Sequence, residues 1–443
     1  MKKILSSLLA LAFSAGVFAQ TTTNIMSGVV FFDGYASVVS APTPTGVIRF
    51  RNDLVTKKLT AQDLAAVGNE LTINITISAL CDNYDRIGNV SLALVPPGST
   101  TYDPATVSRI EIGRFITPFM NKNVQPTSVP YSFEVNNIAK ILKSADIASN
   151  FDFWLELEVF GVPYAANTQV SGCSGRNDVF EGKVDFVSNG PNAGFNPETY
   201  LQALSFKADF NNYQAAATDA VGTTVKTITF TTSQPIYDAK FYLITSNHGA
   251  NSGGEEYVRR VHNVDFDGSQ ILTYTPGGKS CEPYRQYNTQ GNGIYGSSAQ
   301  TASWWTSWNN WCPGDVIPIR EISLGTLSAG THTFKISVPA AQFSGQNGNF
   351  PLSLYLQGSK SEVLAIEELN KMALHLFPNP ANSVLNIQTD KDIQQLELLD
   401  ASGKVLRKEL TNPVNLAGID TGIYFIQVRF ADGMISRQRF MKK

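Results

Sequence analysis

Short runs in which apolar and polar residues alternate dominate the chain. The clearest run is Leu71–Ile77, which reads Leu-Thr-Ile-Asn-Ile-Thr-Ile, and Thr224–Thr232 and His332–Val338 alternate in the same way. Period-two alternation places every second side chain on one face of a strand, and Gly, Pro, Asn and Asp clusters separate such runs. Only Thr60–Val67 and Asn137–Ser144 have a helical pattern, and both are short. The pattern predicts an all-β protein of antiparallel, jelly-roll-like sandwiches.

Turn-rich segments divide the chain into three β units. A nearly uncharged stretch at 188–199 contains Ser-Asn-Gly-Pro-Asn-Ala-Gly, and the alternation stops again at 357–368, where a short acidic segment begins. A length of 443 residues also predicts about three domains. We therefore expect adjacent jelly-roll domains at 21–190 and 191–360, followed by a small Ig-like sandwich at 366–443.

The N-terminus has the pattern of a secretory signal peptide. Lys2 and Lys3 precede the apolar run Ile4–Phe13, and Val-Phe-Ala at 17–19 forms a small-residue cleavage site. The apolar run is too short to span about 30 Å of hydrocarbon. Residues 1–19 are therefore predicted to direct export to the periplasm and to be removed.

Composition narrows the class of protein further. Only 16% of the residues are charged and the formal net charge is −3, so the chain lacks the basic footprint of a nucleic-acid-binding protein. No later segment reaches 18 consecutive apolar residues. Nothing in the sequence indicates an obligate assembly. We expect a secreted monomer with no nucleic-acid partner.

Four cysteines, Cys81, Cys173, Cys281 and Cys312, would lie in an oxidising compartment after export. An even number is most simply explained by two disulfides, for which three pairings are possible. No two of them have zinc-ligand spacing, and the four histidines are scattered. No metal or other cofactor is therefore predicted.

The last unit carries paired motifs at its ends. It begins with Leu-Phe-Pro-Asn-Pro-Ala at 376–381 and ends with Gly-Ile-Tyr-Phe-Ile-Gln-Val at 422–428, and strands at 384–387 and 396–399 precede a hairpin turn at 400–403. The unit resembles the type A C-terminal sorting domain of the type IX secretion system of Bacteroidetes. That resemblance implies a secretion address that the type IX machinery reads. An ordinary Ig-like accessory domain is the alternative.

Three stretches gather ionisable groups in a chain that has few of them. The first, Cys-Asp-Asn-Tyr-Asp-Arg at 81–86, directly follows an apolar strand. A carboxylate beside an arginine can be held ionised and directed at a ligand, because the neighbouring cation lowers its pKa. A salt bridge within a turn fits the same residues. The sequence leaves both interpretations open.

The other two stretches are a strand and a glycine-rich loop. In the predicted strand Phe151–Gly161, Glu156 and Glu158 share one face, which either meets solvent or lines a cleft. The loop Gly253–Arg260 reads Gly-Gly-Glu-Glu-Tyr-Val-Arg-Arg and follows Asn-His-Gly at 247–249. Glycines there would let the backbone approach a ligand closely, although a plain polar loop is the simpler interpretation.

Taken in order with Glu111–Pro118, Pro276–Cys281 and Asn310–Gly314, these stretches resemble the peptide-N-glycosidase F family over about residues 70–355. The resemblance implies two jelly-roll halves and a peptide-N4-(N-acetyl-beta-glucosaminyl)asparagine amidase. Such an enzyme hydrolyses the amide between Asn and the first N-acetylglucosamine of N-glycoproteins or glycopeptides and leaves Asp. It also implies the disulfide Cys281–Cys312 and, with it, Cys81–Cys173.

The resemblance also assigns roles to individual residues. Asp85 is the principal catalytic carboxylate, and Glu256 and Glu158 are the assisting carboxylates, with Glu156 as the alternative to Glu158. Carboxylates in a cleft between two sandwiches can act as base, as holder of the water and as acceptor for sugar hydroxyls. The implied substrate contacts are Arg86, Tyr84, Tyr257, Trp308, Glu156 and, against the core sugars, Phe160.

The sequence departs from the family at two places. Trp308 stands where the family has an arginine near the active centre, which loses a charge-assisted contact and keeps a stacking surface. Gly254 and Val258 replace a pair of cysteines. The indole belongs to a run of Trp304, Trp305, Trp308 and Trp311 in one loop, which is explained either by sugar stacking or by packing within the loop.

Two other functions compete with the amidase. Trp308 favours a glycan-binding protein that kept the cleft and lost turnover. An adhesive surface sandwich would instead leave the carboxylates solvated. The histidines His248 and His262, close to Glu256 in sequence, are expected to be structural. A copper monooxygenase would need several paired histidine ligands, which the chain lacks.

Overall fold

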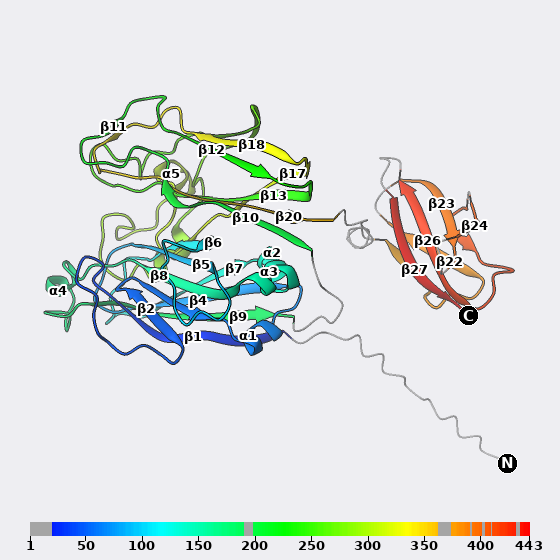
Figure 1. Cartoon of the computed structure of the whole chain (residues 1–443), viewed down its shortest axis with the longest axis horizontal. Coiled ribbons are helices and arrows are strands. Elements are labelled where there is room, and N and C mark those ends of the chain that lie inside the picture. Colours follow the sequence, from blue (N-terminus) through cyan, green and yellow to red (C-terminus); the bar gives the residue numbers. More distant parts are fainter. Residues whose placement is uncertain are drawn as a thin grey trace, which may run out of the picture. The chain divides into compact units, whose positions relative to one another are not determined.

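A computed structural model gives the fold of the protein and divides it into two compact units, Met1–Ser361 and Glu362–Lys443 (Figure 1). The predicted signal peptide lies outside the described residues, as do 190–197 and 362–373 at the predicted domain boundaries. The structure describes residues 20–189, 198–361, 374–389, 392–400, 404–408, 410–430 and 435–443.

The first sandwich consists of two antiparallel sheets whose strands alternate as the sequence predicts. In β4 (Leu71–Ala79) every second side chain is buried, which confirms the strand expected at Leu71–Ile77. One sheet has the order β1 (Thr21–Phe32), β9 (Asp178–Ser188), β4 and β7 (Ser128–Glu134). The other has the order β16 (Val316–Ile317), β6 (Ser108–Ile116), β5 (Ile87–Val95), β8 (Asp152–Val159), β3 (Leu54–Lys58) and β2 (Val47–Arg51).

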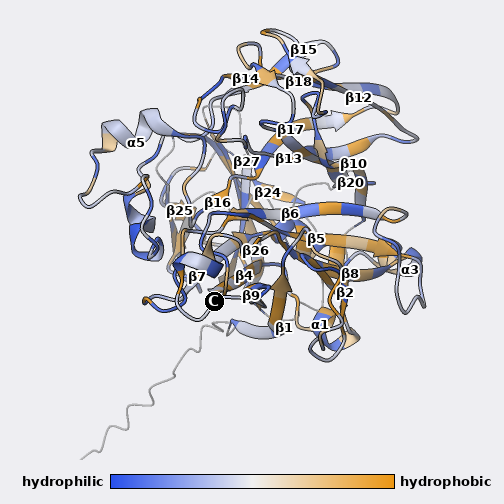
Figure 2. Cartoon of the chain, turned by 90° about the vertical axis from the view of Figure 1, so that its left-hand side faces the viewer, coloured by the Kyte–Doolittle hydropathy of each residue, from blue (hydrophilic) through white to orange (hydrophobic). Residues whose placement is uncertain are grey.

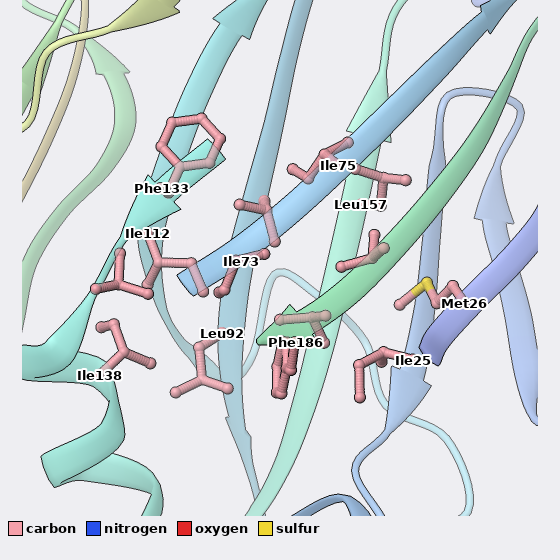
Figure 3. Close-up of a cluster of buried hydrophobic side chains, with 14 of the residues drawn as sticks. Ile25, Met26, Ile73, Ile75, Leu92, Ile112, Phe133, Ile138, Leu157 and Phe186 are labelled. Atoms are coloured by element: carbon pink, nitrogen blue, oxygen red, sulfur yellow. The ribbon is translucent and has the colours of Figure 1, made fainter. Parts of the chain in front are cut away.

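The core of this sandwich is a single apolar layer between its two sheets. Figure 3 shows Ile73 and Ile75 from one sheet facing Leu92, Ile112 and Leu157 from the other. Burial of such side chains stabilises the fold by about 25 cal/mol per Å² of apolar surface removed from water. In Figure 2 the hydrophobic colour accordingly concentrates on strands such as β1, β5 and β8.

The second sandwich has the same two-sheet plan and a core rich in phenylalanine, for example Phe241, Phe334 and Phe350. The strands expected at Thr224–Thr232 and His332–Val338 are confirmed as β12 (Val225–Thr232) and β18 (Gly330–Ser337). One sheet has the order β10 (Thr199–Asp209), β20 (Pro351–Ser359), β13 (Ile236–Thr245) and β17 (Arg320–Leu327). The other has the order β12, β18, β14 (His262–Phe266) and β15 (Ser269–Tyr274), and β11 (Thr218–Asp219) pairs with β19 (Phe343–Ser344).

The two sandwiches are joined by a strand and by a buried ion pair. β16 comes from the second half of the chain and pairs with β6 of the first sandwich. From β6, Arg114 binds Glu111 at 2.6 Å and donates to Ser246 Oγ at 2.7 Å and to the Pro351 carbonyl at 2.9 Å. Glu111 accepts from Ser353 at 2.5 Å. These contacts make one unit of the two sandwiches.

The helices are short, and the prediction of only two was wrong. The expected segments at 60–67 and 137–144 contain α1 (Ala61–Ala65), which Thr60 caps, and α2 (Asn136–Leu142). The sequence analysis missed α3 (Ala145–Asn150), α4 (Ala166–Gln169), the 3₁₀-helix η1 (Glu282–Tyr287) and α5 (Ala302–Trp308). Each spans at most two turns, so no apolar periodicity can develop along it.

The C-terminal unit is a separate small sandwich with its own core, which includes Leu385, Leu398, Ile426 and Phe440. The expected strands at 384–387 and 396–399 are confirmed. Residues 401–403 of the predicted hairpin turn lie outside the described residues. One sheet has the order β21 (His375–Phe377), β22 (Val384–Gln388), β25 (Val414–Asn415), and the other β24 (Val405–Arg407), β23 (Ile393–Leu399), β26 (Gly422–Phe430), β27 (Ile435–Lys442).

Within the described part of the chain, no helix has the length and apolar character needed to cross a membrane.

Candidate active site

The loop between β4 and β5 is built around Asp82, not Asp85. Asp82 is 1% exposed and accepts hydrogen bonds from Arg86 Nε at 2.7 Å, from the Tyr84 amide at 3.0 Å and from the Val162 amide at 2.7 Å. The disulfide between Cys81 and Cys173 holds the start of the loop against a neighbouring loop. Of the two interpretations that the sequence left open, the salt bridge within the turn therefore holds for Arg86, which is paired with Asp82.

Asp85 is left in an environment that favours its protonated form. Its side chain is half-buried, and within the described part of the chain its Oδ2 has no hydrogen-bond partner. Burial and the nearby charge of Glu256 raise the pKa of Asp85 to about 7, although the Arg86 cation opposes the shift. A carboxyl with a pKa near neutrality and one free oxygen has the properties of a general base.

Glu256 reaches the same site from the second sandwich. Its Oε2 accepts a hydrogen bond from the Gly249 amide at 2.7 Å, and burial raises its pKa. Asn310, which the sequence analysis did not single out as a site residue, donates its side-chain amide to the Glu256 carbonyl at 2.6 Å and to the Glu255 carbonyl at 3.0 Å. Its position directly before Trp311-Cys312-Pro313-Gly314, in a stretch that carries the family resemblance, was the sequence signal that could have identified Asn310 as a site residue.

The glycines of this loop allow backbone segments to pack against one another. A Cβ atom at Gly249, whose φ is +110°, would lie 2.1 Å from the Asn347 carbonyl oxygen, and one at Gly254 would lie 2.2 Å from the Gly249 carbonyl oxygen. Close packing of the backbone therefore requires glycine at both positions. The neighbouring Glu255 is 2% exposed and forms a salt bridge with Arg260 at 2.7 Å. It braces the loop.

Aromatic side chains border the carboxylates on the side of the second sandwich. The rings of Tyr257 and Trp308 lie 5.2 Å apart, and Trp308 stacks on Trp304 at 5.5 Å with an interplanar angle of 15°. Burial, Glu256 and Asp85, in that order, raise the pKa of Tyr257, so its hydroxyl is close to both acids.

Part of the tryptophan run packs within the loop, which is one of the two explanations that the sequence left open. Trp305 is fully buried beside the Cys281–Cys312 disulfide and donates to Glu282 at 2.8 Å. Trp311 is also buried and donates to the Asn247 carbonyl at 2.8 Å. Trp304 and Trp308 are only partly buried. Both implied disulfides are present in the structure.

On the side of the first sandwich, Arg86 and two aromatic rings follow Asp85. The Arg86 guanidinium carbon lies 5.4 Å from the Tyr84 ring centroid and 6.0 Å from that of Phe160. Tyr84 is 43% exposed. Both rings therefore lie beside Arg86, the residue after Asp85.

Glu158 and Glu156 interact with other partners. Glu158 binds Lys207 of the second sandwich at 2.5 Å and Arg51 at 3.2 Å, and although burial acts against it, these cations lower its pKa. Glu156 is 1% exposed and accepts from the Tyr102 hydroxyl at 2.8 Å and from Arg109 at 2.6 Å. Its side of β8 therefore neither meets solvent nor lines a cleft at Glu156.

Two histidines near the site are neutral. Burial lowers the pKa of His248 to about 3 and that of His262 to about 4. His248 exchanges a hydrogen bond with Ser246 at 2.6 Å and thereby connects to Arg114. Among the described residues, no group of three or more His, Cys, Asp or Glu side chains is arranged to hold a metal ion.

Two interlocked β-sandwiches with a carboxylate pair where they meet define a two-domain fold that sequence and structure comparisons recognise. The sequence model "Peptide-N-glycosidase F, N terminal" matches residues 22–174, and "Peptide-N-glycosidase F, C terminal" matches residues 212–357. The two matches together span more than half of the chain, which therefore belongs to the peptide-N-glycosidase F family. A third sequence model, "Secretion system C-terminal sorting domain", matches residues 375–443.

Solved structures confirm the fold class. PNGF-II in two crystal forms is similar to this chain with TM-scores of 0.56 and 0.53 at 17% identity, covering 77% of this chain and 66% and 65% of those chains. The chain thus spans just under two thirds of their length. PNGase F, a glycosylasparaginase from Flavobacterium meningosepticum, matches with a TM-score of 0.45 and 16% identity over 77% of this chain and 96% of that chain. No curated protein sequence matches.

Proposed function

We propose that the protein is a secreted amidase that hydrolyses the bond between asparagine and the first N-acetylglucosamine of N-glycoproteins or glycopeptides. Family membership supports the reaction class, and one observation supports it in this chain. Asp85, a half-buried carboxyl with a free oxygen, has its pKa raised to about 7 by burial and by Glu256. At neutral pH such a carboxyl is partly ionised, and its carboxylate form accepts a proton from water.

The proposed reaction consumes one water at the amide. Asp85 takes a proton from the water, and the oxygen of the water forms a bond to the carbonyl carbon of the asparagine side chain. The carbon–nitrogen bond then breaks, and the nitrogen leaves with the sugar and accepts the proton. The peptide keeps the new oxygen as aspartate. The glycosylamine then exchanges its amine for a second water, which releases ammonia and the free glycan.

The other site residues have supporting roles in this proposal. Glu256, held by the Gly249 amide, raises the pKa of Asp85 and accepts a hydrogen bond from the water or from a sugar hydroxyl. Tyr84, Phe160, Tyr257 and Trp308 stack on the core sugars, and Arg86 contacts the glycan while paired with Asp82. Glu158 acts as an anchor between the sandwiches, because it is bound to Lys207.

The C-terminal unit gives the proposed route of export. A sorting domain supports secretion or display at the cell surface. We propose that the chain reaches the periplasm through its signal peptide and then uses the type IX machinery, which recognises the C-terminal unit. The catalytic part acts as a monomer outside the cell.

Mass spectrometry of a defined N-glycopeptide, incubated with the mature protein in heavy-oxygen water, tests the amidase. The expected result is release of the intact glycan and conversion of Asn to Asp that carries one heavy oxygen. Asp85→Asn should abolish both. Asp209→Asn is the matched control, because burial also raises the pKa of Asp209, in the second sandwich. Intact glycopeptide across high-mannose and complex glycans would contradict the proposal.

The competing function is glycan binding without turnover. It is favoured by Trp308, which stacks between Trp304 and Tyr257 where the family has an arginine. In that case the glycopeptide stays intact and binds the protein, and Trp308→Ala weakens the binding while Asp85→Asn does not. Dependence of turnover on Asp85 would exclude this function.

A further inference from the structure

An exposed pair of tyrosines lies beside the first-sandwich side of the site. Tyr35 is 73% exposed and Tyr164 is 59% exposed. Tyr35 belongs to the loop between β1 and β2, and Tyr164 follows β8. Neither residue lies in the stretches that carry the family resemblance. Large exposed aromatic groups that lie together are typical of binding surfaces.

The pair continues the row of side chains that begins at Asp85. The Tyr35 ring contacts the Phe160 ring edge-on, with centroids 5.2 Å apart and an interplanar angle of 73°. Phe160 in turn lies beside Arg86, the residue after Asp85. Gly34 lets the loop lie flat on this ring, since a Cβ there would be 2.6 Å from Phe160. The surface thus runs from Asp85 through Arg86 and Phe160 to Tyr35.

The loop that carries Tyr35 is held in place by buried hydrogen bonds. Asn52 is 2% exposed and donates to the carbonyl oxygens of Asp33 at 2.8 Å and Ser37 at 3.1 Å, and it accepts from the Val39 amide at 2.9 Å. The Asp33 carboxylate accepts from the Tyr35 amide at 3.0 Å. A surface that is ordered before binding loses less entropy when a ligand arrives.

Asp33 also brings Tyr164 into the same patch. The Gly34 amide donates to the Gly161 carbonyl at 2.9 Å, which holds the loop beside the segment that carries Tyr164. Partial desolvation and the neighbouring Asp33 carboxylate raise the pKa of Tyr164. The Asp33 carboxylate is buried, and Arg86 is already neutralised by Asp82. The patch therefore offers aromatic faces and hydroxyls, which suit a neutral sugar.

We propose that Tyr35 and Tyr164 form a subsite for a neutral sugar of the N-glycan that lies beyond the two core N-acetylglucosamine residues. The proposal rests on the proposed function, because it takes the glycan to extend from Asp85 past Phe160. Tyr35 lies one ring further along this surface than Phe160 does. Its ring stacks on the apolar face of the sugar, and the exposed Tyr164 hydroxyl exchanges a hydrogen bond with one of the sugar hydroxyls.

The experiment compares two substrates that differ only in the glycan. One peptide carries only the two core N-acetylglucosamines, and the same peptide carries a complete high-mannose glycan. In Tyr35→Ala and Tyr164→Ala, KM for the high-mannose substrate should rise by about fivefold to tenfold with kcat unchanged. KM for the truncated substrate should stay the same. Tyr35→Phe should behave like the unchanged protein.

Tyr213→Ala, at another exposed tyrosine in the second sandwich, is the matched control and should change neither KM. Equal effects of Tyr35→Ala on both substrates, or no effect on either, would overturn the subsite. A lengthened peptide with the same glycan checks the other possible occupant. If the effect of Tyr35→Ala grows with peptide length, the surface binds polypeptide and the proposal is wrong.

Titration with free high-mannose oligosaccharide separates this proposal from the amidase. If the protein shows no turnover but Tyr35→Ala weakens oligosaccharide binding about fivefold or more, the subsite stands and the proposed function fails. If turnover depends on Asp85 and Tyr35→Ala changes neither binding nor the KM ratio, the proposed function stands and the subsite is wrong.

Discussion

The two aspartates of the loop at 81–86 show how burial and pairing separate chemically identical groups. Asp82 is enclosed by Arg86 and by two backbone amides. Asp85 keeps one free oxygen and lies close enough to Glu256 for that charge to raise its pKa. Arg86, the only cation of the loop, therefore fixes the shape of the loop through Asp82, and the pKa of Asp85 stays close to 7.

Replacing Glu256 should lower the pKa of Asp85. Since the charge of Glu256 contributes to the upward shift, Glu256→Gln should move the titration midpoint of the Asp85 carboxyl from about 7 to a lower pH. Carbon-detected NMR of the carboxyl measures this without any need for turnover. In a protein that keeps activity, the acidic limb of kcat/KM should move in the same direction. Glu321→Gln at an exposed site is the control. An unchanged midpoint in Glu256→Gln would show that the two acids do not interact.

The raised pKa also predicts a pH-dependent cost in stability. The folded-state pKa of Asp85, about 7, exceeds its ordinary value of 3.8, so the carboxyl contributes stability only in its protonated form. That contribution is complete below pH 3.8 and is lost as the pH rises through 7. Asp85→Asn should therefore stabilise the protein at pH 8 by on the order of 1–3 kcal/mol and should have little effect near pH 3.8. Urea unfolding at both values tests this, and a destabilised variant at pH 8 would refute it.

At the scale of elements, strand β6 connects the two halves of the site. Arg114 from this strand donates to Ser246, Ser246 is hydrogen-bonded to His248, and the next amide, that of Gly249, holds Glu256. A chain of short contacts thus runs from the first sandwich to the assisting carboxylate. The motif at 111–118 thus supplies Glu111 and Arg114, which join the two sandwiches.

Ser246→Ala should weaken that joint. The change leaves the buried Arg114 and His248 without one hydrogen bond each, which should cost about 1–3 kcal/mol in the free energy of unfolding. Glu256 should become less well positioned, so kcat should fall more than KM changes. Ser205→Ala is the control, because the Ser205 hydroxyl donates to the Leu352 carbonyl of β20 and not to Arg114 or His248. Equal effects of both variants on kcat would argue against a positioning role.

For the whole molecule, the separate cores predict that the two units fold independently. The catalytic unit has its own apolar clusters, and the C-terminal unit is closed around another that includes Leu398 and Ile426. A chain that ends at Ser361 should keep the unfolding midpoint and glycopeptide turnover of the catalytic unit. In a cell with the secretion machinery it should remain inside the envelope. Loss of turnover in the purified shortened chain would contradict the separation of the units.

Much of the fold followed from local pattern. Period-two runs placed strands such as β4, β12 and β18, because alternation is a property of adjacent residues and does not depend on the rest of the fold. The short helices escaped detection for the opposite reason. α5 has only two turns, and its best local signal was Thr301, whose hydroxyl accepts from the Trp304 amide as an N-cap. A single capping residue cannot distinguish a helix from a turn.

The site was predictable only in part. The sequence by itself determined that four cysteines occur together with three stretches rich in ionisable groups, and the family resemblance named Asp85 and Glu256. Only the tertiary structure decided that Arg86 pairs with Asp82, that Glu156 is sealed by Arg109, and that Asp85 lies close enough to Glu256 to be shifted toward neutrality. The physical reason is that charge interactions depend on distance and burial, and residues far apart in sequence acquire both only when the sandwiches pack.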